Sequence, residues 1–259
     1  MPLKTAAKAG IVKKTYMKRY PVHYYEVDFR GKALPLSLIN FLQDAAGDHA
    51  ARLGFSVLGL MKRNLTWLLS RYHVRVQRYP EVGETVVVTT WPSGTQGIFA
   101  LRDFKAVDGK NETLAVATSS WVLWNITAKK PASLEENLPD RIALHRRALE
   151  DDFASLPPCD EPADATSFRV GIQDIDFNNH VNHASYILWA LESPPETILR
   201  SHAPFEIEVA YRAEAFYGDE ILAKIRTAEK GPDTVFLHGL YQKSRGIELA
   251  RLRTLWRPV

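Results

Sequence analysis

The chain has 259 residues, of which 46% are hydrophobic and 24% charged, and this composition is that of an ordinary soluble globular protein. The formal net charge of +3 is too small to indicate nucleic-acid binding, and no apolar run is long enough to cross a bilayer. The single cysteine, Cys159, excludes an internal disulfide and agrees with a reducing, cytoplasmic location.

The chain begins with a basic segment. Residues 1–20 contain lysine and arginine but no acidic residue, and they lack the apolar core of a secretory signal. We expect a solvated leader here, and a short organelle-targeting segment is the alternative.

The first half of the chain is predicted to contain one long helix followed by antiparallel strands. Apolar residues recur at helical spacing over residues 36–53, Pro35 lies just before them, and Gly54 lies where a helix often ends. The apolar arc is wide, so we expect the helix to be buried on most sides. Strand-like segments follow at residues 66–76, 85–91, 98–106 and 113–125, separated by short turns.

A segment of different character follows. Residues 126–166 are rich in proline and charge, and they are interpreted as a linker with one short helix near residues 141–148. Cys159 lies in this linker, and we expect it to be exposed.

After the linker the order of elements begins again. A helix is predicted at residues 182–192, and it ends before Pro194 and Pro195; strands follow at residues 205–213, 220–227, 234–242 and 248–257. Residues 174–177 resemble residues 26–29, an offset of 176 − 28 = 148, and Trp256 matches Trp121 at 256 − 121 = 135. These similarities indicate a duplication.

A helix followed by antiparallel strands, twice, is typical of a sheet wrapped around a buried helix. We therefore predict an α+β fold, a tandem (double) hotdog. The N-terminal hotdog is placed at residues 1–125, the linker at residues 126–166 and the C-terminal hotdog at residues 167–259. The two sheets are expected to join edge to edge, which also protects two exposed edges.

The densest group of polar residues lies just before the second helix. Asp176, Asn178 and His180 alternate, so in an extended segment their side chains would share one face. The start of a helix offers free backbone N–H groups that suit an oxyanion. In the alternative interpretation the Asp and Asn residues only shape a turn and cap the helix, and His180 has no role.

The same residues carry a resemblance to a known family. The stretch D-I-D-F-N-N-H-V-N-H-A-S-Y-I-L-W-A-L-E-S (residues 174–193) resembles the active-site segment of plant and bacterial acyl-acyl carrier protein thioesterases. Further matches lie at residues 64–71, 78–91, 119–125 and 211–215. The resemblance implies hydrolysis of the thioester of fatty acyl-acyl carrier protein (acyl-ACP), which releases free fatty acid and terminates fatty acid synthesis. It also implies a carrier-protein partner and neither a metal nor an organic cofactor.

The resemblance places the family's catalytic set on four residues of this chain: Asp176, Asn178, His180 and Glu214. Plant members often have a cysteine after that glutamate, whereas this chain has Ala215. Because the only thiol lies in the linker, a Cys–His mechanism is not expected.

The expected mechanism is general-base hydrolysis. Asp176, together with Glu214, would activate a water, and Asn178 would hold either that water or the carboxylate. His180, or backbone N–H groups near Val181 and Asn182, would stabilise the thioester oxygen. Direct attack by Asp176 and proton transfer to His180 stay open as alternatives.

Three other interpretations are weighed. His180 and His183 have the spacing of metal ligands, but no third ligand with recognisable spacing follows. Asp28, the counterpart of Asp176, is followed by Arg30 and Lys32, so the first half lacks the catalytic set and is assigned to holding the acyl chain. The rival functions are an acyl-CoA thioesterase and a non-catalytic acyl-binding hotdog protein, and a homodimer is left open.

Overall fold

The computed structural model describes residues 14–138, 143–159 and 164–259, so most of the expected basic leader lies outside the described residues. The first half contains the strands β1 (Tyr16–Pro21), β2 (Leu65–Val76), β3 (Thr85–Gln96), β4 (Phe99–Val107) and β5 (Thr113–Asn125). It also contains the 3-10 helix η1 (Tyr24–Glu26) and the helices α1 (Pro35–Arg52) and α2 (Val57–Met61).

The second half repeats this order. Its strands are β7 (Asp164–Arg169), β8 (His202–Tyr211), β9 (Glu220–Glu229), β10 (Thr234–Gln242) and β11 (Ile247–Pro258). Its helices are η3 (Ile172–Asp174), α4 (His183–Leu191) and α5 (Glu196–Ser201). The helices predicted at residues 36–53 and 182–192 and the eight predicted strands are confirmed, while β1, β7, α2 and α5 are elements that the sequence pattern did not reveal.

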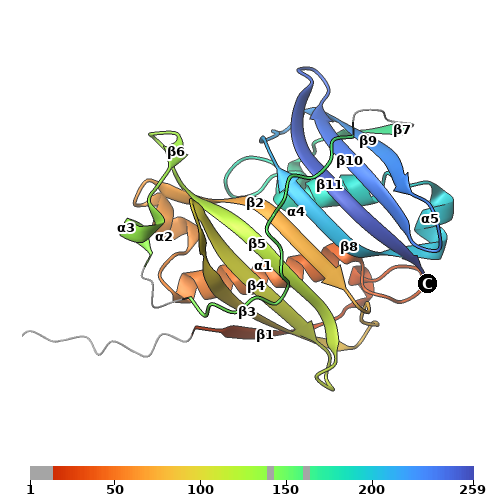
Figure 1. The fold of residues 1–259 in the computed structure, drawn as a ribbon, viewed down its shortest axis with the longest axis horizontal. Helices are drawn as coiled ribbons and strands as arrows, with labels where there is room; N and C mark the ends of the chain where they lie inside the picture. The colour runs from red at the N-terminus through yellow and green to blue at the C-terminus, as the bar shows by residue number, and fades with distance from the viewer. Residues whose placement is uncertain (1–13, 139–142, 160–163) are drawn as a thin grey trace, which may run out of the picture.

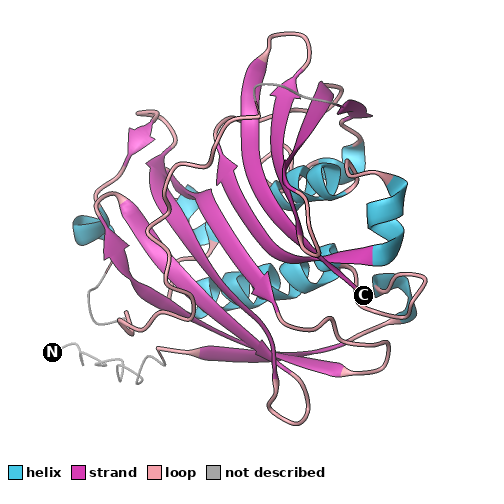
Figure 2. Ribbon diagram, turned by 45° about the vertical axis from the view of Figure 1, so that its right-hand side comes forward, coloured by secondary structure: helices cyan, strands magenta, loops and turns pink. Residues whose placement is uncertain are grey.

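The strands form one antiparallel sheet in the order β1-β3-β4-β5-β2-β8-β11-β10-β9-β7, and the short β6 (Lys130–Pro131) pairs with β5. Figures 1 and 2 show the sheet curving around the two central helices, α1 and α4, which lie on its inner face. The fold is therefore the expected double hotdog.

The halves join edge to edge through β2 and β8, as expected. The register runs from Arg71 opposite Ala210 to Arg75 opposite Glu206, with His73 opposite Glu208 at its centre. The offset of 135 that relates the halves also relates these central residues, because 208 − 73 = 135. The pair of His73 and Glu208 thus lies on the pseudo-two-fold axis of the molecule.

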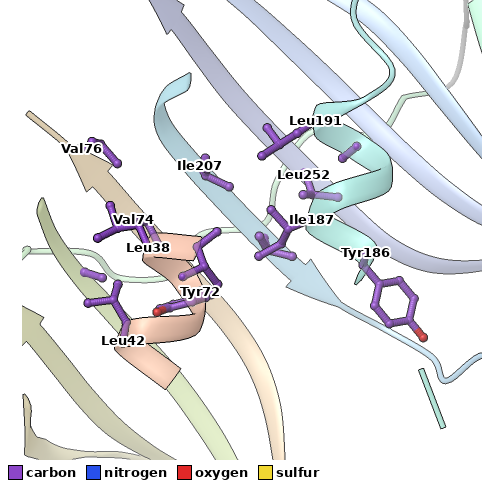
Figure 3. Packing of buried hydrophobic residues seen from close by; sticks show 14 of the residues in the cluster. Leu38, Leu42, Tyr72, Val74, Val76, Tyr186, Ile187, Leu191, Ile207 and Leu252 are labelled. Atoms are coloured by element: carbon purple, nitrogen blue, oxygen red, sulfur yellow. The ribbon is translucent and has the colours of Figure 1, made fainter. Parts of the chain in front are cut away.

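The larger of two apolar clusters among the described residues spans both halves. Tyr72 and Val74 of β2 face the helices, and their neighbours on the sheet include Ile207 of β8. Leu38 of α1 and Ile187 of α4 pack into the same cluster (Figure 3). All five residues are at most 1% exposed, so the junction is held by burial as well as by the strand pairing.

Strand β3 runs further than predicted. The stretch at residues 92–94 was expected to end it, but the strand continues to Gln96 through a bulge between Pro92 and Gly94. Among the described residues β1 pairs with β3 only as far as Thr90, so Pro92 lies beyond that ladder and its missing N–H costs little. Gly94 has a φ of 143°, which glycine adopts without strain.

The segment between the halves packs against the outer face of the sheet. The predicted helix near residues 141–148 is wrong for residues 143–148, which are not helical; residues 139–142 lie outside the described part. Contacts with the sheet replace helical bonds: Leu144 N–H donates to Pro92 O at 2.9 Å, and Ala148 N–H donates to Asp103 Oδ2 at 2.6 Å. A short helix, α3 (Leu134–Asn137), forms earlier in the segment.

Cys159 is fully buried, so its expected exposure is also wrong. The reason is that the linker chain is held down, for example by Arg251 Nη1, which donates to Leu156 O at 2.8 Å. Across the described ranges, no helix has both the length and the apolar character needed to span a membrane.

Candidate active site

Residues 175–181 form a closed turn just before α4. An isolated bridge joins Ile175 and Val181, Asp176 N–H donates to His180 O at 2.9 Å, and Asn179 N–H donates to Asp176 O at 3.0 Å. The predicted extended conformation is therefore wrong. Asp176 Oδ1 accepts the N–H of Asn178 at 2.7 Å, and Asn179 has a φ of 65°; an Asp side chain and an Asn in the left-handed region are the ordinary causes of such a turn.

The turn nevertheless brings the predicted side chains together. His180 Nδ1 lies 3.7 Å from Asp176 Oδ1, and His180 Nε2 lies 3.7 Å from Glu214 Oε1. Asn178 Nδ2 donates to Asp176 Oδ2 at 3.4 Å. The imidazole thus stands between two carboxylates, and an amide holds one of them.

Glu214 reaches the turn from the loop after β8. The loop is fixed because Val181 N–H donates to Ala215 O at 2.8 Å, and Ala215 N–H donates to Tyr186 Oη at 3.0 Å. The side chains of His180 and Asp176 are 20% and 22% exposed, and that of Glu214 is 51% exposed, so a substrate can reach all three from solvent. Tyr186, which sequence reasoning missed, helps to position Glu214 through this bond.

The backbone N–H groups that were expected to bind an oxyanion are already used. Val181 N–H is bonded to Ala215 O, and Asn182 N–H donates to Asp174 O at 2.7 Å. Asn182 is the N-cap of α4, and its Oδ1 accepts the N–H of Ala184 at 2.9 Å. The expected role of these two N–H groups is therefore wrong, because strand-like pairing occupies them; of the groups proposed, His180 stays available.

His183 lies at the first position of α4 on the inner side of the turn. Burial lowers its pKa to about 4, although the nearby charge of Asp176 opposes this shift, so the ring is neutral at pH 7. The ring packs edge-on against Tyr211, with centroids 6.3 Å apart, and the Tyr211 hydroxyl donates to His183 O at 3.0 Å. Its contacts are thus those of the helix start rather than of a metal site shared with His180.

The described residues contain one group with the spacing of metal ligands, and it lies elsewhere. His73, Glu206 and Glu208 meet at the junction of β2 and β8. Arg75 Nη2 lies 2.6 Å from Glu206, and Arg253 Nη1 lies 2.7 Å from Glu208. Cationic side chains therefore already neutralise both glutamates.

A pocket of about 210 Å³ lies in the first half, between α1, α2 and the sheet. Ala46 and Ala50 of α1 line one side, whereas Ala45 on the same helix is buried in the core. Trp67 of β2 and Trp121 of β5 lie among the residues from the sheet. The lining is largely apolar, with the shape and chemistry that suit an alkyl chain.

Comparison with known proteins agrees with this architecture. The family models described as the N-terminal and C-terminal domains of acyl-ACP thioesterase match residues 13–142 and 159–258. The chain belongs to the acyl-ACP thioesterase family.

Relatives within the acyl-ACP thioesterase family match along nearly the whole chain. A chloroplastic acyl-[acyl-carrier-protein] hydrolase of Cuphea viscosissima is 32% identical over 94% of this chain, which spans 63% of the length of that relative. The solved 12:0-ACP thioesterase from Umbellularia californica is 27% identical and covers 96% of both chains with a TM-score of 0.88. An acyl-ACP thioesterase from Bacteroides thetaiotaomicron is 26% identical, covering 94% of this chain and 98% of its own, with a TM-score of 0.83.

In this member of the acyl-ACP thioesterase family the first half repeats the turn without counterparts of Asn178 and His180. Asp28 N–H donates to Lys32 O at 2.8 Å, and Arg30 N–H donates to Asp28 Oδ1 at 2.9 Å, as in the turn at Asp176. Arg30 and Lys32 stand where the second half has Asn178 and His180. Tyr79 is the counterpart of Glu214, because 214 − 79 = 135, and its hydroxyl donates to the backbone of the second half.

Proposed function

We propose that this chain hydrolyses the thioester of a fatty acyl-ACP, releasing free fatty acid and terminating fatty acid synthesis. The observation that supports this most directly is the imidazole of His180, 3.7 Å from each of two carboxylates on a solvent-accessible turn. The names of the relatives in Cuphea and Umbellularia assign an acyl-ACP substrate to those proteins, and the match along both halves supports the same substrate here.

In the proposed mechanism Asp176 acts as the general base. Each of its oxygens accepts a hydrogen bond from Asn178, which fixes the carboxylate while leaving lone pairs for a water. Asp176, with Glu214 as the second carboxylate, takes a proton as the water oxygen attacks the carbonyl carbon. His180 donates to the developing oxyanion, the C–S bond breaks, and the departing carrier thiolate takes up the proton that Asp176 removed from the water.

We further propose a division of labour between the halves. The C-terminal hotdog, residues 167–259, holds the catalytic side chains, and the N-terminal hotdog, residues 1–125, holds the acyl chain, with residues 126–166 as the connection. The pocket lined by Ala46 and Ala50 supports acyl binding by the N-terminal hotdog. Catalysis by the C-terminal hotdog is supported by the presence of Arg30 and Lys32, in place of an asparagine and a histidine, in the turn at Asp28.

Carrier, location and assembly complete the proposal. Acyl-ACP is preferred over acyl-CoA because both family matches name the carrier protein, and assaying both thioesters tests this preference. A cytoplasmic location agrees with the single, buried thiol, whereas the relative in Cuphea is chloroplastic by name. A homodimer is a further hypothesis, and light scattering of the purified chain tests it.

The decisive experiment compares two matched aspartates. Asp176→Asn keeps the acceptor for the Asn178 N–H but removes the charge, and Asp28→Asn makes the same change in the first turn, where Arg30 N–H is the donor. We expect Asp176→Asn to lower turnover of acyl-ACP by about a hundredfold or more, because a general base is lost. We expect Asp28→Asn to keep turnover nearly intact.

Further variants test whether the group acts as a unit. His180→Ala and Glu214→Gln should also lower turnover, and a double variant should be little worse than the worst single one. Thermal melts must first establish that each variant folds. Normal turnover of a folded Asp176→Asn protein would refute the site, and equal losses at Asp28 would refute the division of labour.

A further inference from the structure

Arg102 places a cation on the wall of the first-half pocket. It lies on β4, and its side chain lines the pocket together with Ala46 and Trp121. Its Nη1 donates to His49 Nδ1 and to Thr90 Oγ1, each at 3.2 Å. Because arginine only donates, the accepting His49 nitrogen carries no proton, so this contact places no negative charge beside the guanidinium.

The adjacent acid cannot neutralise Arg102. Asp103 follows it on β4, and successive side chains of a strand point to opposite faces of the sheet. The Asp103 carboxylate lies on the outer face, where Arg147 Nε is 3.2 Å away and Ala148 N–H donates to it. Within residues 14–138, 143–159 and 164–259, no carboxylate lies within ion-pair distance of Arg102.

An uncompensated guanidinium in an apolar pocket is unfavourable. Burial lowers the pKa of Arg102 to about 10, which still leaves it charged at pH 7. A purely alkyl chain would leave the charge of Arg102 without a counter-charge, and this would oppose binding.

We propose that Arg102 binds a carboxylate, so that the first-half pocket takes a chain with a carboxylate at its polar wall and methylenes along the rest. The proposal rests on the proposed function, since it concerns the pocket assigned to the acyl chain. A guanidinium matches a carboxylate with two parallel hydrogen bonds, and the apolar surroundings strengthen the attraction. Trp67 and Trp121 supply the apolar surface beside it.

Two molecules bring a carboxylate to this pocket. One is an acyl substrate with a second carboxyl group at its distal end. The other is a free fatty acid, the product of hydrolysis, which would enter head first and inhibit the enzyme. The two differ in whether the carboxylate is present before or after the thioester is cleaved.

Calorimetric binding of decanoate and decanol to the whole protein tests the proposal without any turnover. We expect decanoate to bind about tenfold or more tightly than decanol, because a charged hydrogen bond is added. Arg102→Gln should abolish this preference. Lys105→Gln, an equal charge change at an exposed position of the same strand, should retain it.

Equal affinities of the wild-type protein for decanoate and decanol would overturn the proposal, and so would a preference that persists in folded Arg102→Gln. Arg102→Lys keeps the charge but loses the two-pronged donor, and it serves if Arg102→Gln fails to fold. We expect a weakened preference in that variant, and an unchanged one would also count against the proposal.

Two kinetic arms then identify the source of the carboxylate. A distal carboxylate predicts that acyl-ACP with a terminal carboxyl group has a lower KM than plain acyl-ACP of equal length, and that Arg102→Gln removes this advantage. If the carboxylate is that of the released fatty acid, decanoate should inhibit competitively, and Arg102→Gln should relieve this inhibition. Absence of hydrolysis with every acyl-ACP would refute the proposed function alone, because the binding result is independent of turnover.

Discussion

His73, at the junction of the two halves, should make the protein less stable at alkaline pH. His73 Nδ1 lies 2.7 Å from Asp151 Oδ2 of the linker, and His73 Nε2 lies 2.9 Å from Glu206 Oε1 of β8. Burial lowers the pKa of His73, but the hydrogen bonds to the two carboxylates outweigh it and raise the pKa from 6.5 to about 9. The charged ring therefore joins three segments of the chain.

The size of the effect follows from the shift. A rise from 6.5 to about 9 corresponds to about 3 kcal/mol of unfolding free energy, at about 1.4 kcal/mol for each pKa unit. The side chains of His73 and Glu206 are 9% and 11% exposed, so solvent screening reduces this little. Because the folded pKa is raised, the contribution is complete below pH 6.5 and is lost as the pH rises through about 9.

The pKa of Glu206, a carboxylate partner of His73, is shifted by the same interaction. Hydrogen bonds from His73, opposed by burial and aided by Arg75, lower the pKa of Glu206 from 4.5 to about 2. Its contribution is complete above pH 4.5 and is lost as the pH falls through about 2. The two shifts describe one pair, so their free energies are not added.

Urea unfolding of the wild-type protein and His73→Gln at about pH 6 and about pH 9.5 measures this contribution. The wild type should lose on the order of 3 kcal/mol between the two pH values, and His73→Gln should lose much less. His23→Gln, a change at an exposed histidine, is the matched control and should follow the wild type. Parallel pH dependence in the wild type and His73→Gln would refute the reasoning.

Three further predictions concern the pocket, the thiol and the carrier. Ala46→Phe should shift the preference toward shorter acyl chains, since each methylene excluded from the pocket forfeits about 0.8 kcal/mol; a panel of acyl-ACP lengths measures this, and unchanged preference in a folded variant would rule out this wall. Cys159→Ser should leave turnover within about twofold but lower the melting temperature, because a buried site receives a hydroxyl; loss of turnover in the folded variant would restore a role for the thiol. Rising salt should raise KM for acyl-ACP more than it changes kcat, because exposed basic residues such as Lys62 and Lys130 attract an acidic carrier; a KM that is flat with ionic strength would contradict this.

Sequence periodicity was enough to predict the helices and strands whose buried residues recur at regular spacing. The apolar spacing that predicted a helix at residues 36–53 corresponds to α1, and β5 has the predicted bounds of residues 113–125. The helix prediction was wrong at residues 143–148 because backbone groups of this segment bond to Pro92 and Asp103, which are distant in sequence. Such tertiary bonds override local helix propensity.

The candidate site was predictable in its residues but not in its geometry. Asp176, Asn178 and His180 were singled out as alternating positions of an extended segment, whereas a turn at Asn179 brings them together. The isolation of Arg102 from any described counter-charge had no sequence signal at all. It depends on which face of β4 the side chain takes, and Asp103, the nearest acid in sequence, takes the other face.

The junction shows what a covalent link permits that a two-chain assembly does not. In a dimer of identical chains, a residue on the two-fold axis always faces its own copy, so a histidine there meets a histidine and a glutamate meets a glutamate. Here the axial positions belong to one chain, and His73 stands opposite Glu208. Opposite charges can be placed on the axis only when the two positions are encoded separately, and the neighbouring Glu206 and Asp151 extend that asymmetry to the linker.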